Sequence, residues 1–439
     1  MTELLQMPRG TRDILPVEIR LWQFIEETVV RIFELYNYSE IRTPIFEHTD
    51  LFTQSLGHTS DIVEKEMYTF NDRKGRSLTL RPEGTASVVR SYLEHSIHKN
   101  EALTKVYYRG PMFRYERPQA GRFRQFHQIG VECLGSRNPI LDAEMIGLGV
   151  HLFDEIGLTE LKVMLNSVGC NICRPVIREQ LREFIGDNLK HLCEDCNRRF
   201  TNNPLRILDC KKPTCQKYTM GIPMFSICQD CGDHFNAVQE YLDAMNITFV
   251  VDNHLVRGLE YYTKTTFEIV SPDLGAQNAI CGGGRYDKLV QMMGGPDIPA
   301  VGFAFGLERA AMLLQQLGIQ GKNPPALTLY VAPQGHLATL QGMELLDDFR
   351  RANLRADIDV SGRSLKNQLK AANKLGAEYV LIIGEDEAEQ KVGLLKNMAN
   401  GQQQTLAFSD VLNHFFLGTE TVQPIQPNQL VLRGMEEVL

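Results

Sequence analysis

The sequence predicts an α+β protein with a mainly antiparallel sheet core that carries helices, a helical insertion in that core, and a small C-terminal α/β domain. Three observations support this fold class. Short β-rich runs fill residues 41–132, eight of the ten cysteines lie in a largely helical stretch between Cys170 and Cys231, and strand-like and helix-like segments alternate after Pro325. A chain of 439 residues accommodates about three domains.

The composition is typical of a packed globular protein, with 43% hydrophobic and 23% charged residues, and it excludes disordered, collagen-like and coiled-coil classes. No uninterrupted apolar stretch approaches the ~20 residues that a bilayer span needs. Residues 1–12 contain no apolar signal-peptide core. We therefore expect a cytoplasmic protein without membrane contact. The formal charge of −8 does not exclude nucleic-acid binding, because a local basic face can contact phosphates.

The first elements form an interrupted core. A helical pattern runs from about Pro16 to Tyr36. It is followed by one helix near 84–96 and by β-rich runs at 67–70, 77–81, 105–109, 113–116 and 125–133. Residues 1–173 are the first part of the core, and residues 174–246 are a mainly helical, cysteine-rich insertion. Strand signals return at 249–251, 265–270 and 300–305, so residues 247–317 complete the core.

A second folding unit follows a linker. Residues 318–325 (GIQGKNPP) have a linker composition. Strand-like runs at 327–331, 356–360 and 379–383 then alternate with helical runs at 338–352 and 364–375, which predicts a small open α/β domain over 326–418. Residues 419–439 form a tail with little signal.

A basic face is predicted on the second helix of this unit. No acid interrupts residues 361–376, and four cations share one narrow face: Arg363, Lys366, Lys370 and Lys374. A solvated charged face and an RNA-binding face both fit this pattern.

The clustered cysteines are arranged as in structural zinc sites. They form three C-x-x-C pairs (Cys170/Cys173, Cys193/Cys196, Cys228/Cys231) together with Cys210 and Cys215. A gap of two residues lets both thiolates reach one tetrahedral ion, and two four-thiolate sites would use all eight. The spacing does not fix which cysteines share an ion. The alternatives are buried free thiols in a reducing cytoplasm, or disulfides in a secreted chain.

The segment 113–132 (FRYERPQAGRFRQFHQIGVE) contains the residues of a polar cleft. Strand alternation places polar residues on one face of two adjacent strands, with Arg114 and Glu116 on the first and Gln128, Gly130 and Glu132 on the next. The loop between them adds Arg117, Arg122 and Arg124. Guanidinium groups suit phosphate oxygens because they present a planar fork of donors that stays charged. An exposed structural hairpin and an anion site both fit this segment.

Residues 300–313 (AVGFAFGLERAAML) predict a strand with one face of nearly bare backbone. Gly302, Ala304 and Gly306 alternate with two phenylalanines, so a flat ligand could lie on the bare face. Arg309 follows in the first turn of a helix, where a bound anion would also interact with the positive helix N-terminus. The alternative is close packing of another element on the glycines.

Two further segments, 255–267 (LVRGLEYYTKTTF) and 279–287 (AICGGGRYD), have similar character. Arg257 adjoins a glycine, Tyr261 and Tyr262 offer phenolic donors on opposite strand faces, and the consecutive glycines allow close approach to the backbone. The dinucleotide fingerprint and the phosphate loop are both absent, so arginines on an antiparallel sheet would hold any nucleotide. H-E-x-x-H, G-x-S-x-G and an evident catalytic thiol are also absent.

These segments resemble those of a known family. F-R-Y-E…G-R-F-R-Q-F-H-Q and G-F-A-F-G-L-E-R resemble motifs 2 and 3 of class II aminoacyl-tRNA synthetases, and Pro44 in I-R-T-P-I-F fits motif 1. Within that class, L-V-R-G-L-E-Y-Y and G-G-G-R-Y-D are similar to the two peptides peculiar to histidyl-tRNA synthetases. The resemblance covers the chain from Pro8 to about Phe416. Glu260 stands where the family usually has Asp, and both residues are acidic.

The resemblance implies a two-step reaction. ATP and L-histidine give histidyl-adenylate and pyrophosphate, with Mg²⁺ accompanying ATP, and the histidyl group then passes to the terminal adenosine of tRNA(His). By position, Arg114 would hold the α-phosphate, Glu116 the adenine amino group, and Arg122 and Arg309 the pyrophosphate end. Arg257 resembles the family's catalytic arginine, which stabilises charge on the α-phosphate in place of a metal ion.

The resemblance also implies a histidine pocket, a tRNA-binding domain and a dimer. The pocket would consist of Glu83, Thr85, Gln128, Glu132, Tyr261 and Tyr262, since carboxylates can pair with the α-ammonium and imidazole groups. Residues 1–173 and 247–317 would form the catalytic core, and residues 326–418 would bind the anticodon, which favours RNA contact by the basic face. Motif 1 implies a homodimer.

Two other function classes fit parts of the sequence. A non-catalytic synthetase-like regulatory subunit of histidine biosynthesis tends to lack two features: the peptide that carries the catalytic arginine, which corresponds here to L-V-R-G-L-E-Y-Y, and the C-terminal domain. Here Arg257, Arg114 and Arg309 are present, as is the unit after Pro325. A zinc-stabilised RNA-binding protein would account for the cysteines and the basic helix. It would not account for the arginines or the glycine-rich strand face.

Overall fold

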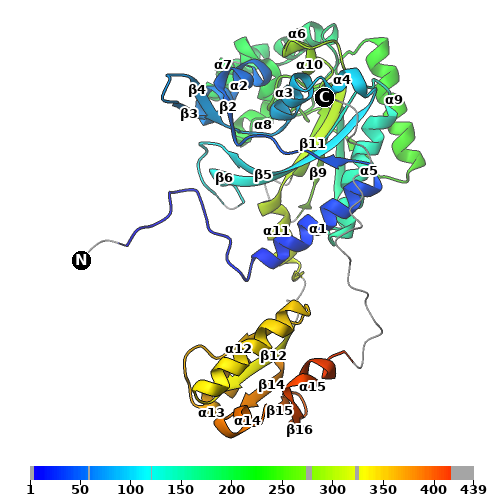
Figure 1. Cartoon of the computed structure of the whole chain (residues 1–439). Coiled ribbons are helices and arrows are strands. Elements are labelled where there is room, and N and C mark those ends of the chain that lie inside the picture. The colour runs from blue at the N-terminus through cyan, green and yellow to red at the C-terminus, as the bar shows by residue number, and fades with distance from the viewer. Residues whose placement is uncertain (1–3, 58–59, 120, 273–278, 322–325, 417–439) are drawn as a thin grey trace. The chain divides into compact units, whose positions relative to one another are not determined.

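The computed structural model (Figure 1) describes residues 4–57, 60–119, 121–272, 279–321 and 326–416. The chain divides into two compact units, Met1–Lys322 and Asn323–Leu439. The fold is α+β, as the sequence predicts. The predicted linker is described only as far as Gly321, and the predicted tail lies outside the described residues. No helix in the described ranges is long and apolar enough to cross a membrane.

An eight-stranded sheet in the order β1-β5-β6-β11-β10-β9-β7-β8 forms the centre of the N-terminal unit. Its strands are β1 (Ser39–Glu40), β5 (Thr104–Phe113), β6 (Gln125–Leu134), β7 (Lys162–Ser167), β8 (Phe249–Val251), β9 (Thr263–Val270), β10 (Ala279–Arg285) and β11 (Ala300–Gly306). The six inner strands (β5, β6, β11, β10, β9 and β7) pair antiparallel with one another. The two edge strands pair parallel with their neighbours, β1 with β5 and β8 with β7. A small antiparallel sheet contains β2 (Phe46–His48), β4 (Ser77–Leu80) and β3 (Tyr68–Asn71).

Four helices cover one face of the large sheet: α1 (Ile19–Leu35), α5 (Ile140–Glu155), α9 (Gln229–Ala244) and α11 (Leu307–Gln316). The predicted helix over residues 16–36 is confirmed as α1, and Leu21, Ile25 and Ile32 are buried against the sheet as the helical period predicts. Val17 and Leu35, at the two ends of the predicted apolar stripe, are exposed instead. The other face carries α2 (Thr49–Leu56), the five-residue helical turn Ile62–Glu66, α3 (Thr85–Glu94), α4 (Ile97–Asn100) and α10 (Leu289–Met292). Part of that second face is uncovered, and the candidate site lies there.

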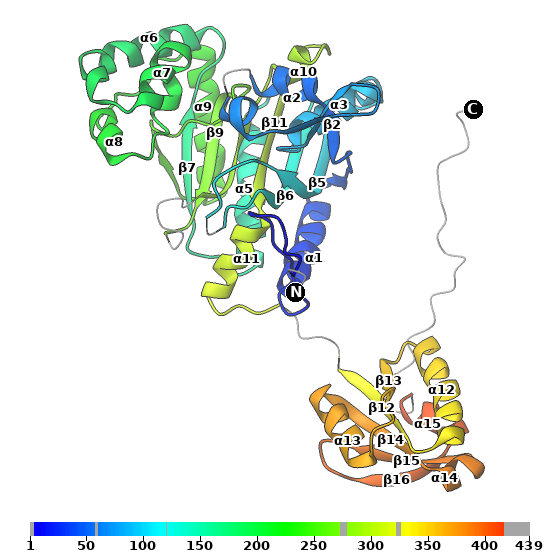
Figure 2. The same cartoon turned by 90° about the vertical axis from the view of Figure 1, so that its left-hand side faces the viewer.

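The cysteine-rich segment is helical, as predicted. It comprises α6 (Cys173–Ile185), a 3₁₀ turn (Gly186–His191), α7 (Glu194–Asn202), a second 3₁₀ turn (Pro204–Ile207), α8 (Pro213–Thr219) and then α9. Figure 2 shows α6, α7 and α8 as one group at the β7 end of the sheet. Their apolar side chains join the core that also contains residues of α2 and α3.

The C-terminal unit contains a five-stranded sheet in the order β13-β12-β14-β15-β16. The strands β12 (Leu327–Pro333), β13 (Ala356–Ile358) and β14 (Ala377–Ile383) are parallel, while β15 (Val392–Asn397) and β16 (Gln403–Ala407) add antiparallel. Its helices are α12 (His336–Arg351), α13 (Leu365–Lys374), α14 (Glu385–Glu389) and α15 (Phe408–His414). Separate apolar clusters cover the two faces of this sheet. The predicted alternation is confirmed, and β15 and β16 are additions that the sequence reading did not include.

The prediction of a separate strand over 113–116 is wrong. The strand β5 runs without a break from Thr104 through Gly110 and Pro111, and it ends at Phe113. It has β6 on one side and pairs with β1 only at residues 106 and 107, so the missing N–H of Pro111 leaves no ladder bond unmade. Arg114 and Glu116 therefore lie beyond the strand, where Glu116 N donates to Arg114 O at 2.8 Å.

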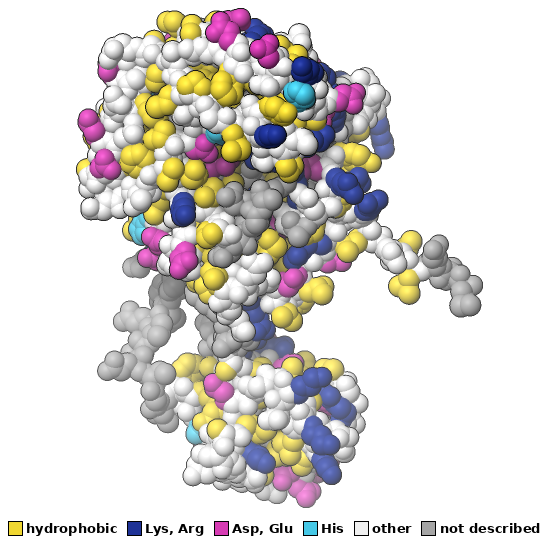
Figure 3. Space-filling model, turned by 180° about the vertical axis from the view of Figure 1, so that it is seen from behind, with side chains coloured by type: hydrophobic (Ala, Val, Ile, Leu, Met, Phe, Trp, Pro, Cys, Tyr) yellow, Lys and Arg dark blue, Asp and Glu magenta, His cyan; other side chains and the backbone are white. Residues whose placement is uncertain are grey.

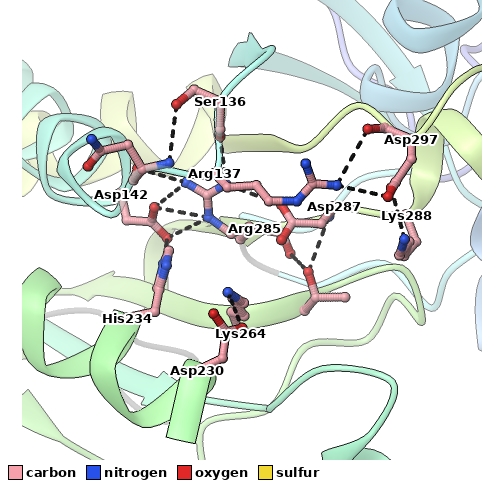
Figure 4. Close-up of polar contacts among 12 residues, drawn as sticks. Ser136, Arg137, Asp142, Asp230, His234, Lys264, Arg285, Asp287, Lys288 and Asp297 are labelled. Carbon is pink, nitrogen blue, oxygen red and sulfur yellow. Dashed lines mark hydrogen bonds and ion pairs between the residues drawn. The ribbon is translucent and has the colours of Figure 1, made fainter.

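Arg285, from the G-G-G-R-Y-D peptide, lies in a buried ion network rather than at the glycine-rich face (Figure 4). It pairs with Asp142 of α5 and with Asp287, and it donates to two carbonyls of the loop before α5. His234 of α9 contacts the same Asp142 carboxylate at 3.2 Å. Burial alone would raise the pKa of Asp142, but the Arg285 charge holds it below its usual value. Removing one partner of such a pair costs about 3–5 kcal/mol.

Candidate active site

The floor of the candidate site is a patch of four strands with very small side chains. Two cross-strand rows build it: Glu268–Gly282–Ala304–Gly130 and Thr266–Gly284–Gly302–Glu132. A Cβ on Gly302 would lie 2.0 Å from Glu132 Oε2, and a Cβ on Gly282 would lie 2.2 Å from an Arg257 nitrogen. The predicted bare strand face is confirmed, and polar side chains lie directly on it.

A cavity of about 240 Å³ opens above this floor. Its lining includes six of the predicted site residues, which come from segments far apart in the sequence: Arg114, Glu116, Arg122, Gln128, Arg257 and Arg309. Phe126 adds an aromatic wall, and the Arg114 guanidinium lies 5.3 Å from its ring centroid. The structure thus brings together the arginines of both hairpin sides, of the 255–267 segment and of α11.

The arginines are held in place by bonds that fix their orientation. Arg114 Nε donates to Pro82 O at 2.8 Å, Arg309 Nη1 donates to Ala279 O at 2.7 Å, and Arg257 Nη1 donates to Glu268 Oε1 at 2.5 Å. Burial and then the positive charge of Arg122 lower the pKa of Arg309. Guanidinium groups stay protonated under such repulsion. Four arginines and three glutamates (Glu116, Glu268 and Glu308) line the cavity, so its lining has a positive balance, and the guanidinium groups are available to an anionic ligand.

Glu116 faces the same charges from the hairpin. It is buried, it forms an ion pair with Arg122, and it lies 3.9 Å from Arg114 Nη1. Glu116 lies beyond the end of β5, so two backbone features set its position. One is the turn that begins at Arg114, and the other is the hydrogen bond that Tyr115 N donates to Glu66 O at 2.7 Å. A carboxylate in this place can accept hydrogen bonds from a ligand's amino group once Arg122 has turned to an anion.

A second, buried cluster adjoins the floor and contains most of the residues predicted for histidine. Thr85 Oγ1 donates to Glu132 Oε1 at 2.6 Å, and the Tyr286 hydroxyl donates to the other oxygen. Burial raises the pKa of Glu132 to about 8. The rings of Tyr261 and Tyr262 lie 4.8 Å apart, and the Arg257 guanidinium lies 5.6 Å from the Tyr262 ring.

The structure distributes the predicted histidine residues unevenly. Among the six, Gln128 lines the cavity, and its buried Oε1 has no hydrogen-bond partner within the described part of the chain. Glu83 accepts the backbone N–H groups of Thr85 and Ala86 at 2.8 Å each, so it caps the start of α3. The prediction that the two tyrosines lie on opposite strand faces is wrong. They precede β9 in a turn, side by side.

Three residues of this site were not singled out from the sequence. Glu268 binds Arg257, Tyr286 donates to Glu132, and Tyr108 lies over Gly130 with its hydroxyl buried and unpaired within the described residues. Glu268 had a sequence signal, because it is the one acid in the strand-like run 265–270. Tyr108 had none, because it reaches the site across the β5–β6 pair.

The basic residues of the C-terminal unit lie partly as predicted. Lys366, Lys370 and Lys374 are exposed on α13, and Figure 3 shows Lys and Arg side chains gathered along one side of this unit. The placement of Arg363 on the same helix is wrong. It precedes α13, and its Nε donates at 2.6 Å to Asp359, an acid just outside the acid-free window.

The eight cysteines fall into two groups of four. Cysteine group 1 contains Cys170, Cys173, Cys228 and Cys231, and cysteine group 2 contains Cys193, Cys196, Cys210 and Cys215. Within each group the sulfur atoms all lie within 4.8 Å of one another. None of the eight forms a disulfide. The geometry thus divides the cysteines into two spatial groups, which the spacing alone does not do.

Comparisons with known proteins place this geometry in a family. The family model "Histidyl-tRNA synthetase" matches residues 10–182 and 219–310, and "Anticodon binding domain" matches residues 328–415. The histidine–tRNA ligase of Moorella thermoacetica is 50% identical over 416 residues, 94% of this chain and 98% of that protein. That of Desulforamulus reducens is 49% identical over 407 residues, 92% of this chain and 97% of that protein.

A solved structure agrees with these sequence relatives. The crystal structure of apo S. aureus histidyl-tRNA synthetase is 38% identical and has a TM-score of 0.78, covering 94% of this chain and 100% of that chain. Fold, cavity and sequence similarity therefore agree, and the chain belongs to the histidyl-tRNA synthetase family.

Proposed function

We propose that this chain is a histidine–tRNA ligase, which activates L-histidine with ATP to histidyl-adenylate and then transfers the histidyl group to the 3′ end of tRNA(His). The observation that carries this function is the convergence of Arg114, Arg257 and Arg309 on one cavity beside the buried Glu132 cluster. The arginines of this cavity suit a triphosphate, and the adjoining Glu132 carboxyl group and phenols offer hydrogen-bond partners to an amino acid with an imidazole side chain.

Within this proposal the arginines divide the phosphates of ATP. Arg114 binds the α-phosphate, and Arg122 and Arg309 bind the pyrophosphate end. Glu116 accepts the adenine amino group after its partner Arg122 moves to the phosphates, and Phe126 supplies an apolar surface to the base. Attack of the histidine carboxylate on the α-phosphorus forms a new P–O bond and breaks the bond to pyrophosphate, which leaves with the electron pair.

Arg257 is the proposed catalytic residue. Its guanidinium lies on the glycine floor and is oriented by Glu268, so it can donate to the α-phosphate oxygens as their charge is redistributed in the transition state. A fixed cation that needs no reorganisation is worth more in a buried site than in water.

Histidine recognition is proposed for the cluster beside the floor. Glu132 is the buried acid nearest to the bare strand face, and the unpaired Gln128 oxygen offers an acceptor at the cavity wall. Tyr261, Tyr262 and Thr85 enclose the amino acid, while Glu83 acts by holding the start of α3. Donors on a substrate ammonium or imidazole would satisfy acceptors that the protein leaves free.

Two metals complete the proposed cofactor set, Mg²⁺ with ATP and structural zinc at the cysteines. Mg²⁺ takes phosphate oxygens plus one or two carboxylates, and Glu268 and Glu308 line the cavity. Among the described residues, groups of three or more potential ligands occur only at the cysteines. The ATP phosphates would therefore supply most of the Mg²⁺ ligands.

The remaining proposals concern domains, partners and location. The catalytic core consists of residues 1–173 and 247–317, interrupted by the insertion at residues 174–246. A linker at residues 318–325 leads to the anticodon-binding domain at residues 326–418. In that domain the proposed RNA contacts are Arg363, Lys366, Lys370 and Lys374. A homodimer is supported by exposed apolar side chains on the small sheet, Phe46 at 52% and Phe70 at 45% exposure. None of the ten cysteines forms a disulfide, which favours a reducing cytoplasm.

The decisive experiment is amino-acid-dependent ATP–pyrophosphate exchange, measured with each of the twenty amino acids. Exchange with L-histidine alone is expected. Absence of exchange, together with tight histidine binding, would instead identify a regulatory relative. Exchange with another amino acid in place of L-histidine would contradict the proposed role of Glu132 in recognising histidine.

A further inference from the structure

Both cysteine groups have the dimensions of a four-thiolate zinc site. Zinc binds thiolate sulfur at about 2.3 Å, so the sulfurs of a tetrahedral site lie about 3.8 Å apart. In cysteine group 1 three sulfur pairs lie 3.7, 3.9 and 3.8 Å apart, and in cysteine group 2 Cys193 and Cys210 lie 4.0 Å apart. Free thiols gain little from such crowding.

Backbone donors support the same arrangement. Cys228 N lies 3.1 Å from Cys173 Sγ, and Cys193 N lies 3.2 Å from Cys215 Sγ. An N–H aimed at a sulfur stabilises a thiolate, which is the form that binds metal. In each group at least two of the four side chains are buried, so the sites are closed to further ligands.

The two groups occupy different places in the chain. Cysteine group 1 joins the end of the first core segment, at Cys170 and Cys173, to the start of α9 in the insertion, at Cys228 and Cys231. Cysteine group 2 lies wholly within the insertion, with Cys193 and Cys196 at the start of α7, Cys210 in the following loop and Cys215 in α8. It also falls in residues 183–218, between the two segments that the synthetase family model matches.

Each group adjoins a residue that binds the arginine peptide, which we define as residues 257–262. Arg174, next to Cys173, donates to the carbonyls of Glu260 and Tyr262. Between Cys196 and Cys210, Arg206 Nη1 donates to Gly258 O at 3.3 Å, and Asn203 Nδ2 donates to Glu260 Oε1 at 3.1 Å.

We propose that each cysteine group binds one Zn²⁺, and that these ions position the arginine peptide through Arg174 and through Arg206 with Asn203. The peptide has no regular secondary structure of its own, yet it carries Arg257, Tyr261 and Tyr262. Its conformation depends on the insertion, and short helices such as the seven-residue α8 are marginal without a cross-link. The positional part of this inference rests on the proposed function, while the metal content does not.

The first experiment measures zinc and iron by elemental analysis of full-length protein purified without added metal. About two zinc ions per chain are expected in the wild type and in Cys133→Ala, a control outside both groups. Cys170→Ser/Cys228→Ser and Cys193→Ser/Cys215→Ser should each retain about one. Wild-type protein with less than about half an equivalent, iron in place of zinc, or unchanged zinc in both double variants overturns the two sites.

The second experiment tests positioning with a variant that keeps all eight cysteines. Arg206→Ala should retain two zinc ions but lower kcat of histidine-dependent pyrophosphate exchange by about 10-fold, with KM for ATP changed much less. Arg206→Lys should recover part of the loss, because an ammonium can still reach Asp61 and the Gly258 carbonyl. Arg198→Ala on α7, which does not contact the peptide, is the matched control.

The outcomes separate the two claims. Unchanged kcat in Arg206→Ala and in the folded cysteine group 2 variant would overturn the positioning role. If the wild type shows no histidine-dependent exchange, the proposed function fails, and the zinc count remains as an independent result.

Discussion

Arg257 is the residue on which the proposed chemistry depends most. It lies over Gly282, where a side chain could not fit, and Glu268 fixes its orientation. Arg257→Ala should lower histidine-dependent pyrophosphate exchange by about 10²–10³-fold, because a donor aimed at developing charge is lost. ATP binding, measured by calorimetry, should weaken far less, since the other arginines still hold the phosphates.

A matched control for this variant is Arg76→Ala, which removes an exposed guanidinium paired with Asp72 in a hairpin away from the cavity. It should exchange pyrophosphate at the wild-type rate. Near-normal exchange in Arg257→Ala would remove the catalytic role, and an equal loss of ATP affinity and rate would make it a binding residue only.

Glu132 gives the site a pH dependence. Burial raises its pKa from 4.5 to about 8, so near neutral pH the folded protein holds a proton that the unfolded chain releases. Its stabilising contribution is complete below about 4.5 and is lost as the pH rises to about 8. Relative to Glu132→Gln, which does not titrate, the wild-type free energy of unfolding should therefore fall over this range.

Urea denaturation of both proteins from about pH 5 to about pH 8.5 checks this expectation, and the change should reach a few kcal/mol, since a tenfold change in proton affinity is worth about 1.4 kcal/mol. A constant difference across the range would mean that Glu132 is ionised throughout, paired with donors stronger than Thr85 and Tyr286.

At the level of elements, α13 carries the clearest candidate for RNA contact. Lys366→Gln/Lys370→Gln should weaken tRNA binding and flatten its dependence on salt by about one unit of slope per lost phosphate contact. Pyrophosphate exchange should not change, because the cavity lies in the other compact unit. Filter binding at several salt concentrations measures the slope.

The control for α13 is Arg351→Gln, an exposed cation at the end of α12 that pairs with Asp347. It should leave the slope unchanged. If the lysine variant behaves like this control, α13 is a solvated face.

Elements with a strong local period were predictable from the sequence, and elements defined by distant pairing were not. The stripe of α1 and the Gly–Phe alternation of β11 follow from local patterns. The strand β5 was split in the prediction because Gly110 and Pro111 normally end strands. They are tolerated here because β1 does not extend along this part of β5; Arg81 lies there instead and donates from Nε to Pro111 O at 3.0 Å. The strand β10 was not predicted because three glycines have little strand propensity, yet strands on both sides hold it.

The site was predictable to the same degree. The arginines were evident because guanidinium groups have few other roles on a glycine-rich sheet. The places of Tyr108 and Tyr286 depend on register across three strands, which spacing along one strand cannot give. Arg363 was misplaced because its partner Asp359 lies before the helix rather than on it.

At the level of the whole molecule, the two units have separate apolar cores. A chain truncated after Gly321 should therefore keep histidine-dependent pyrophosphate exchange within a few fold of the full chain. Charging of tRNA at limiting tRNA should fall by about 100-fold or more, because contacts from two linked units reinforce each other. Loss of exchange in a folded truncated chain would mean that the C-terminal unit supports the cavity directly.

The glycine floor also affects how easily resistance to an inhibitor of this enzyme could arise by mutation. A flat compound stacked on Gly282 and Gly302 would contact main-chain atoms, which no codon change removes. A methyl group at Gly282 would collide with Arg257, and one at Gly302 would collide with Glu132. A mutation that blocked inhibitor binding at either position would therefore also impair this enzyme. Resistance would have to arise at the rim instead, where Phe123 offers a side chain to which the proposed reaction assigns no role.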